Sequence, residues 1–157
     1  MVISDTHGRF DRVINQYNKI KGIDKIIHLG DYYKDAKKIQ KLVNAEVIAV
    51  KGNLDAQLGQ TPNKILHIDG HSILLTHGHL EDVKSGLTKL YYKSLSLSCD
   101  IALFGHTHIP TKLQSDGIML LNPGSLTIPK GGSEPSFALL NFDGNGKYSA
   151  ELICPDI

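Results

Sequence analysis

The chain has 157 residues, of which 41% are hydrophobic and 21% charged, and its formal net charge is +1. This composition excludes a disordered or fibrous chain, and the near-neutral charge gives no strong preference for nucleic acid or anionic membranes. No apolar run approaches the ~20 residues that span a bilayer, no secretory leader is visible, and the only cysteines, Cys99 and Cys154, have no paired spacing. We therefore expect one cytoplasmic domain over residues 1–157.

The first third of the sequence predicts alternating strands and helices. Short apolar runs at 2–4, 25–29 and 46–50 are typical of buried parallel strands, and helical spacing of apolar residues predicts a helix after each of the first two. The buried faces expected for these helices comprise Phe10, Val13, Ile14 and Tyr17 in the first, and Ala36, Ile39, Leu42 and Val43 in the second. The lysines of the second helix are expected to form a solvated face.

From residue 64 the pattern changes to adjacent strands joined by tight turns. A helix is expected over 81–93, then a polar linker over 94–100 and a buried strand over 101–104. The expected hairpins pair residues 64–68 with 72–76, 111–114 with 117–121, and 137–142 with 148–153. This order predicts an α/β domain in which two stacked sheets are flanked by helices.

Potential metal ligands follow five of the predicted strands. The set comprises Asp5, His7, Asp31, Asn53, His77, His106 and His108. Because ligands of open α/β sheets bind at the carboxyl ends of the strands, these side chains are expected to converge. Carboxylate, amide and imidazole donors suit borderline divalent ions better than calcium. Seven ligands are too many for one tetrahedral zinc but fit two ions that share one carboxylate, for which Asp31 is the natural bridge.

Taken together, these motifs resemble the signature of calcineurin-like metallophosphoesterases. The motifs are Asp5-x-His7, Gly30-Asp31, Gly52-Asn53, His77-Gly78 and Gly105-His106-x-His108. The chain is most similar to the small branch that contains the YfcE-type phosphodiesterases and the retromer subunit Vps29. The resemblance implies a four-layer αββα sandwich of two mixed β-sheets with helices outside. It also implies one metal on Asp5, His7, Asp31 and His108, and a second on Asp31, Asn53, His77 and His106.

The function implied by this resemblance is a two-metal phosphoesterase, more readily a phosphodiesterase, in which a metal-bridging hydroxide attacks phosphorus. Manganese is the first choice for both ions, with nickel, zinc, iron, cobalt or magnesium as alternatives, and the expected substrate is a small phosphate ester. Asp31, Asn53 and His77 are expected to serve catalysis as ligands. One rival is a Vps29-like scaffold that binds metal without turnover. A nuclease is a third possibility, but it would need a basic groove that this near-neutral chain does not supply. The terminal hairpins offer edge strands for a homodimer.

Three further residues near these motifs have open roles. Larger family members carry a histidine after the Gly-Asn motif as a general acid or phosphate ligand, whereas this chain has Leu54. Loss of a positioned acid costs roughly 10²–10⁴-fold in rate, so His79 is the candidate substitute, with a supporting or surface histidine as the alternative. Asp55 is expected either to hold a metal-bound imidazole or to stabilise a turn. His28, inside an apolar run, is expected to be a hydrogen-bonded core residue.

Overall fold

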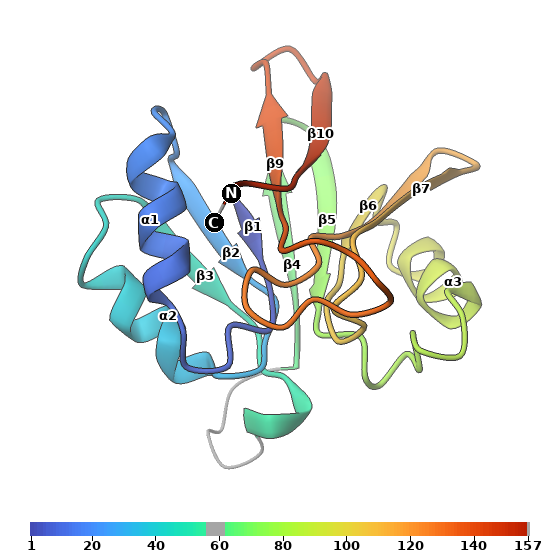
Figure 1. The fold of residues 1–157 in the computed structure, drawn as a ribbon. Coiled ribbons are helices and arrows are strands. Elements are labelled where there is room, and N and C mark those ends of the chain that lie inside the picture. Colours follow the sequence, from blue (N-terminus) through green and yellow to red (C-terminus); the bar gives the residue numbers. More distant parts are fainter. Residues whose placement is uncertain (56–61, 157) are drawn as a thin grey trace.

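The computed structural model describes residues 1–55 and 62–156, and its strands form two five-stranded sheets (Figure 1). The first sheet contains β1 (Val2–Ile3), β2 (Lys25–His28), β3 (Glu46–Ala49), β9 (Phe137–Phe142) and β10 (Tyr148–Ile153). The second contains β4 (Asn63–Ile68), β5 (His71–Thr76), β6 (Ile101–Leu103), β7 (Thr111–Ser115) and β8 (Ile118–Asn122). The helices are α1 (Asp11–Lys19), α2 (Tyr33–Gln40), α3 (Thr88–Ser96) and the short 3₁₀ helix η1 (Asn53–Asp55).

Both sheets are mixed. The first has the order β10-β9-β1-β2-β3, with β1, β2 and β3 parallel and β9 antiparallel to β1. The second has the order β4-β5-β6-β8-β7, with β5, β6 and β8 parallel and an antiparallel strand at each edge. The parallel strands of the second sheet lie in its interior, whereas β3 is an edge strand of the first, and the carboxyl ends of the parallel strands in each sheet can collect ligands.

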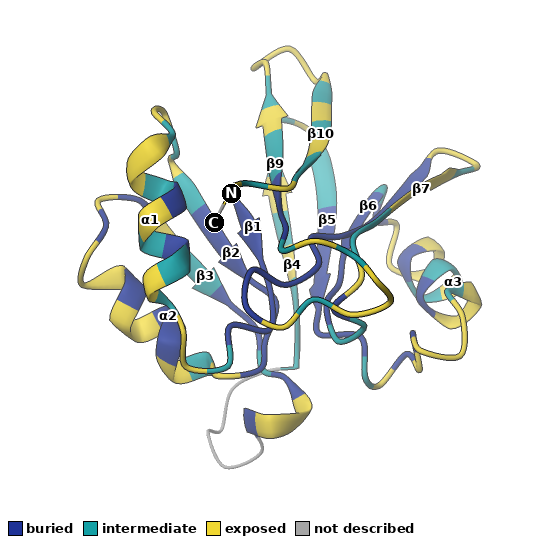
Figure 2. Cartoon of the chain, in the orientation of Figure 1, coloured by how far each residue is buried: buried dark blue, intermediate teal, exposed yellow. Residues whose placement is uncertain are grey.

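Alternating side chains divide the apolar residues into three packed layers. Val2 faces the other sheet, whereas its neighbour Ile3 packs beneath α1 and α2. In the second sheet Ile73 and Leu75 face inward, whereas Leu74 packs towards α3. Figure 2 shows these strands as buried and the outer faces of the helices as exposed. The predicted four-layer α/β sandwich is confirmed.

The three predicted hairpins are confirmed. The two-residue turns have positive φ at both positions, 51° and 82° at Asp69-Gly70 and 47° and 82° at Asp116-Gly117. Aspartate followed by glycine tolerates this geometry, which is why the sequence signal is specific. Within the described residues, no helix combines the length and the apolar character needed to cross a membrane.

Two predicted details are wrong. Helix α3 begins at Thr88 and runs to Ser96, whereas a helix over 81–93 was expected, because Asp82 and Gly86 have φ values of 53° and 147° that no α-helix accommodates. Residues 79–85 instead form turns. Leu42 is 59% exposed because helix α2 ends at Gln40, and its side chain does not join the core.

A polar clamp joins the sheets at the end of the sandwich where β5 begins. His71, to which the sequence assigned no role, pairs with Asp100 and hydrogen-bonds to the carbonyl of Gly146 (3.0 Å) in the β9–β10 turn. The Asp69 carboxylate accepts two further hydrogen bonds from the same turn, from the backbone N–H groups of Gly144 and Gly146 at 3.0 Å each. This clamp fixes the end of the sandwich where the β4–β5 and β9–β10 turns meet.

Candidate metal centre

The loops that carry the predicted ligands meet where the two sheets come together. The backbone N–H of Asp5, after β1, donates to the carbonyl of Gly30 (3.1 Å), after β2. The N–H of Gly105, after β6, donates to the carbonyl of His77 (3.0 Å), after β5. A hydrogen bond also links loops of the two sheets: the backbone N–H of His106, after β6, donates to Asp5 Oδ2 (3.0 Å). The predicted convergence of these strand ends is therefore confirmed.

Two glycines of the motifs allow this close approach. A Cβ atom on Gly52 would lie 2.1 Å from Asp31 Oδ1 and 2.3 Å from the Asp31 backbone nitrogen. A Cβ on Gly105 would lie 2.0 Å from Ser4 Oγ and 3.0 Å from Asp5 Oδ2. Only a residue without a side chain fits at either position, so these glycines determine where the two carboxylates lie.

Five predicted ligands have left-handed backbone conformations. Their φ values are 55° at Asp5, 46° at His7, 54° at Asp31, 69° at His106 and 60° at His108. Each such residue costs free energy unless the surrounding structure stabilises it, and such residues cluster at functional sites. In this protein the left-handed conformations at five loop positions direct the side chains towards the same small volume.

Asp5 lies at the centre of the cluster and is fully buried. Its Oδ2 atom accepts from the Ser4 hydroxyl (2.6 Å) and from the His106 backbone, whereas Oδ1 lies 3.2 Å from His108 Nε2 and 3.9 Å from His77 Nε2. Burial alone would raise the pKa of the Asp5 carboxyl, but the neighbouring His108 and His77 rings, together with the Ser4 hydroxyl, lower it to about 2. The carboxylate is therefore ionised at neutral pH.

Backbone carbonyls orient two of the histidines. His77 Nδ1 donates to the carbonyl of Leu29 (2.8 Å), and His108 Nδ1 donates to that of Ile128 (2.7 Å). In each ring Nε2 then faces Asp5, and His77 Nε2 also lies 3.5 Å from an oxygen of Asp31. A carbonyl that fixes the tautomer in this way is the usual support of a metal-binding imidazole.

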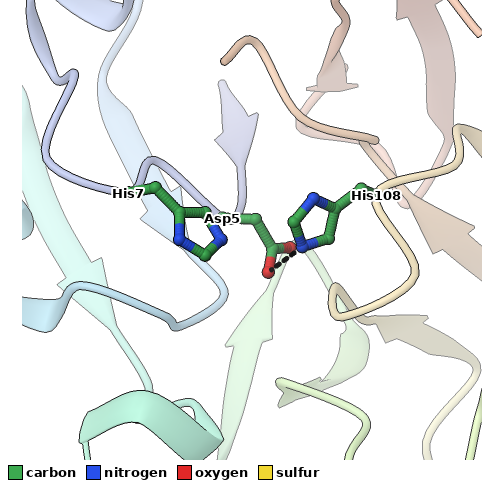
Figure 3. Close-up of side chains that lie close together, drawn as sticks. All are labelled: Asp5, His7 and His108. Carbon is green, nitrogen blue, oxygen red and sulfur yellow. Dashed lines mark ion pairs between the residues drawn. The ribbon is translucent and has the colours of Figure 1, made fainter. Parts of the chain in front are cut away.

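The donor atoms form two groups that can each hold an ion. Asp5, His7 and His108 form one group, shown in Figure 3, and Asp5, Asp31 and His77 form the other, with ligand atoms within 4.8 Å of one another in each. Asp5 Oδ1 and His7 Nε2 are buried without any hydrogen-bond partner. Buried polar atoms are rarely unpaired, and a cation would satisfy both, so the residues fit a metal ion.

The sequence itself decides the family. Residues 1–145 match the family model described as the calcineurin-like phosphoesterase superfamily domain. The chain belongs to the calcineurin-like phosphoesterase superfamily. The family expected from the motifs is confirmed, and so is the expectation of a hydrolase that acts on phosphoesters.

Individual relatives of this phosphoesterase agree with that assignment. The phosphodiesterase YfcE of Escherichia coli (strain K12) is 31% identical over 168 residues, which cover 91% of this chain and 87% of YfcE. A conserved protein of Streptococcus pneumoniae described as a predicted phosphoesterase has a TM-score of 0.80, 27% identity, and coverage of 98% of this chain and 87% of that chain. A Vps29 mutant from Entamoeba histolytica has a TM-score of 0.77, 25% identity, and coverage of 99% and 98%.

The other predicted ligands of this phosphoesterase lie at the same site with different surroundings. His106 Nδ1 lies 3.2 Å from His77 Nε2, and burial, followed by His77 and Lys84, lowers the pKa of His106 to about 4, which keeps the ring neutral. Asn53 is exposed at the start of η1, and its amide remains a predicted ligand. Asp5 is the carboxylate common to both donor groups, whereas the sequence favoured Asp31, which belongs to one.

The three residues with open roles lie near this centre. His79 Nδ1 is buried without a hydrogen-bond partner, its ring lies 5.4 Å from that of His77, and burial and His77 lower its pKa. Leu54 is 58% exposed, and its backbone N–H donates to Asp31 Oδ1 (3.0 Å). Asp55 holds no imidazole: its oxygens accept from the backbone N–H groups of Tyr33 (2.9 Å) and Gly52 (3.0 Å), so the turn interpretation is correct.

Sequence reasoning missed the residues that hold the Asp5 loop through hydrogen bonds to its backbone. The hydroxyls of Ser125 and Thr127 both donate to the Asp5 carbonyl at 2.9 Å. The Asn122 amide donates to the carbonyl of Gly105 (2.8 Å) and so fixes the other ligand-bearing loop. The only available signal was Asn122-Pro123-Gly124-Ser125, which is typical of an ordinary loop.

A buried chain of hydrogen bonds supports the same loop through His28. This ring is fully buried, as predicted; its Nδ1 accepts from the Gly30 N–H (3.2 Å), and its Nε2 donates to the Thr6 hydroxyl (3.0 Å). The Thr6 hydroxyl donates to Asp35 Oδ2 (2.8 Å), which also accepts from the Gly8 N–H (2.8 Å). The segment between Asp5 and α1 is thereby tied to both β2 and α2.

Lowering the pH should destabilise this phosphoesterase through His28. Burial lowers the pKa of His28 to about 4, well below the usual value for a histidine. The unfolded chain therefore binds the extra proton first, and the free energy of unfolding falls between pH 6.5 and 4, by about 3 kcal/mol from this group. Urea unfolding in chelator at several pH values measures the effect. The His28→Asn variant, whose amide oxygen can accept from the Gly30 N–H, should lose less free energy of unfolding as the pH falls. An equal pH dependence of stability in both proteins would contradict the assignment.

Proposed function

We propose that residues 1–157 act as one domain, a two-metal phosphodiesterase that hydrolyses a small phosphate diester. The observation that carries this proposal is the presence of two adjoining donor groups, one with Asp5, His7 and His108 and the other with Asp5, Asp31 and His77. The first ion would be held by Asp5, His7, Asp31 and His108, and the second by Asp31, Asn53, His77 and His106. When bound, two divalent ions supply a hydroxide nucleophile near neutral pH and neutralise charge on the phosphate oxygens.

The ligand residues would hold the ions in place and would not transfer protons themselves. His77, His106 and His108 would serve as ligands and not as bases, since two of these rings are fixed by backbone carbonyls and the lowered pKa of His106, about 4, makes it a weak base. The mixed nitrogen and oxygen donors support manganese as the first choice, with nickel, zinc, iron, cobalt or magnesium as alternatives. The name of the relative YfcE supports a diester as the substrate.

A Vps29-like scaffold is the second candidate function. It is favoured by the likeness to Vps29 over 99% of this chain. Fold alone does not set function, however, and the complete donor set favours catalysis. Strand β10 lies at an open edge of the first sheet, which supports a homodimer formed through the terminal hairpin.

Restoring metal to stripped protein distinguishes the two functions. Chelator-treated protein should be inactive, and manganese or another of the proposed ions should restore hydrolysis of bis(p-nitrophenyl) phosphate in preference to p-nitrophenyl phosphate. Release of p-nitrophenol measures turnover, and calorimetry measures ion binding. Ion binding without cleavage of either ester by any ion would favour the scaffold.

His79 is proposed as the proton donor that replaces the missing histidine at Leu54. His79→Ala should slow the hydrolysis of diesters with poor leaving groups by about 10²-fold or more and leave activated nitrophenyl esters little changed, since only poor leaving groups need a proton. The measurement compares kcat for phenyl and p-nitrophenyl methyl phosphates. An equal loss on both would show that His79 supports the site without donating a proton. His67→Ala, at an exposed position of β4, is the matched control.

A further inference from the structure

Exposed apolar side chains gather around the candidate metal centre. Among the described residues, eleven large apolar side chains are exposed, and five of these adjoin or contact a predicted site residue. We call these five the apolar rim: Tyr32, Leu54, Leu80, Ile109 and Ile128, which are between 39% and 60% exposed. Single exposed apolar residues are normal on a protein surface, but a group of them around one site marks a ligand or partner.

Two members of the apolar rim belong to the loops of the first sheet. The Tyr32 ring lies 5.1 Å from the ring of His7, centroid to centroid, so its aromatic face borders one donor group. Leu54 is held beside Asp31 by the hydrogen bond from its backbone N–H to that carboxylate. Both positions therefore place apolar surface beside predicted ligands without coordinating metal themselves.

The other three members belong to the second sheet and the long loop after β8. Ile128 offers its carbonyl to His108 Nδ1, and Ile109 follows His108 directly in the chain. Ile109 also packs against Gly131, where an added Cβ would lie 2.8 Å from its Cδ1. Leu80 follows His79 and is the most exposed member of the apolar rim. The apolar rim is thus distributed over loops from both sheets.

A pocket beside the apolar rim has room for a small ring. Its volume is about 260 Å³, and its walls include Val83, Leu87 and Phe104. Thr107, which separates two predicted ligands in the chain, and Ile109 of the apolar rim also line it. Apolar walls with a few polar groups are typical of small-molecule sites.

Three lysines add positive charge around the same loops. Lys84 lines the pocket, and the backbone N–H of Lys130 donates to the carbonyl of His108 (3.2 Å). Lys51 immediately precedes the Gly52-Asn53 motif. These charges attract an anion such as a phosphate towards the centre, although the chain as a whole is near neutral.

We propose that the substrate is a phosphodiester in which the ester group that stays on the phosphate is apolar and larger than methyl, either aryl or alkyl. This inference rests on the proposed phosphodiesterase function. The apolar rim and the adjoining pocket would bind the apolar group, since burying apolar surface favours binding, while the lysines attract the phosphate. A sugar or nucleoside group would lose water without gaining hydrogen bonds from Leu80, Ile109 or Ile128.

Two diesters with the same leaving group test the proposal. With the ion that restores turnover, phenyl p-nitrophenyl phosphate should be cleaved with kcat/KM about tenfold above that of methyl p-nitrophenyl phosphate. Leu80→Ser and Ile109→Ser should each reduce this preference about fivefold. Leu95→Ser, on exposed α3 surface, is the matched control and should change neither rate.

A binding measurement keeps the test independent of turnover. Phenylphosphonate and methylphosphonate contain no ester bond, and calorimetry on the metal-loaded protein should give about tenfold tighter binding of the phenyl compound, a difference reduced in both serine variants. Failure to cleave either diester would overturn the phosphodiesterase function, and the phosphonates would still test the apolar rim. Equal affinity and equal rates for phenyl and methyl compounds, with turnover intact, would overturn the inference alone.

Discussion

Asp31→Asn should abolish metal-restored phosphodiester hydrolysis while the protein remains folded. Loss of this carboxylate removes one of the two negative charges near the donor atoms of His77, and in the proposed centre it removes the bridge between the ions. We expect kcat to fall by about 10³-fold or more, since positioned metal ions stabilise the transition state by several kcal/mol. The fold should persist because an asparagine oxygen can still accept the N–H of Leu54, now 3.0 Å from Asp31 Oδ1.

The measurement is p-nitrophenol release across a titration of each ion, with circular dichroism and urea unfolding of the metal-free variant. Asp24→Asn, at an exposed position before β2, is the matched control and should retain full activity. If Asp31→Asn keeps full turnover, the two-metal mechanism is wrong. If saturating metal restores turnover completely, Asp31 contributes to affinity and not to the reaction.

Gly52→Ala should strongly destabilise the protein. The added Cβ would lie 2.3 Å from the Asp31 backbone nitrogen, and a backbone atom cannot rotate away as a flexible side chain can. We expect the free energy of unfolding of the metal-free protein to fall by about 3 kcal/mol from overpacking. Ion affinity should fall as well, since the displaced atoms include the Asp31 carboxylate.

Gly22→Ala provides the comparison, because an added Cβ there meets nothing within 4 Å and the residue has a φ of 77°. That variant should lose about 1–2 kcal/mol from backbone strain alone and keep its ion affinity. Urea unfolding and calorimetric titration of both variants separate steric displacement at the centre from ordinary glycine strain. Equal losses of stability with normal ion affinity in both would mean that Gly52 has no special part in placing Asp31.

Much of the fold could be predicted because local signals agreed with the final packing. The Asp69-Gly70 and Asp116-Gly117 turns need positive φ at both positions, and the sequence supplies residues that tolerate it. The start of α3 could not be predicted, since apolar spacing across 81–93 imitates a helix while Asp82 and Gly86 adopt conformations that prevent one. Leu42 was misplaced because spacing alone does not show where a helix stops.

The meeting of the candidate ligands could be predicted for a topological reason. Parallel strands of one sheet place their carboxyl ends together, so residues such as Asp5 and Asp31 come close although 26 positions separate them in the chain. The central position of Asp5 depends on distances between loops, which a sequence does not contain. The hydrogen bonds from Ser125 and Thr127 to the Asp5 carbonyl could not be predicted either, because the sequence does not show which group a loop hydroxyl will contact.

The placement of the donor atoms on loops from both sheets has a consequence for the lifetime of the protein. Asp5 and Asp31 follow strands of the first sheet, whereas His77 and His108 follow strands of the second, so a bound ion fastens one sheet to the other. Ligands that bind only the native state stabilise it by about 4 kcal/mol at a thousand times their dissociation constant. The supply of free metal would then set how often the sandwich opens, and so how quickly proteases degrade the chain.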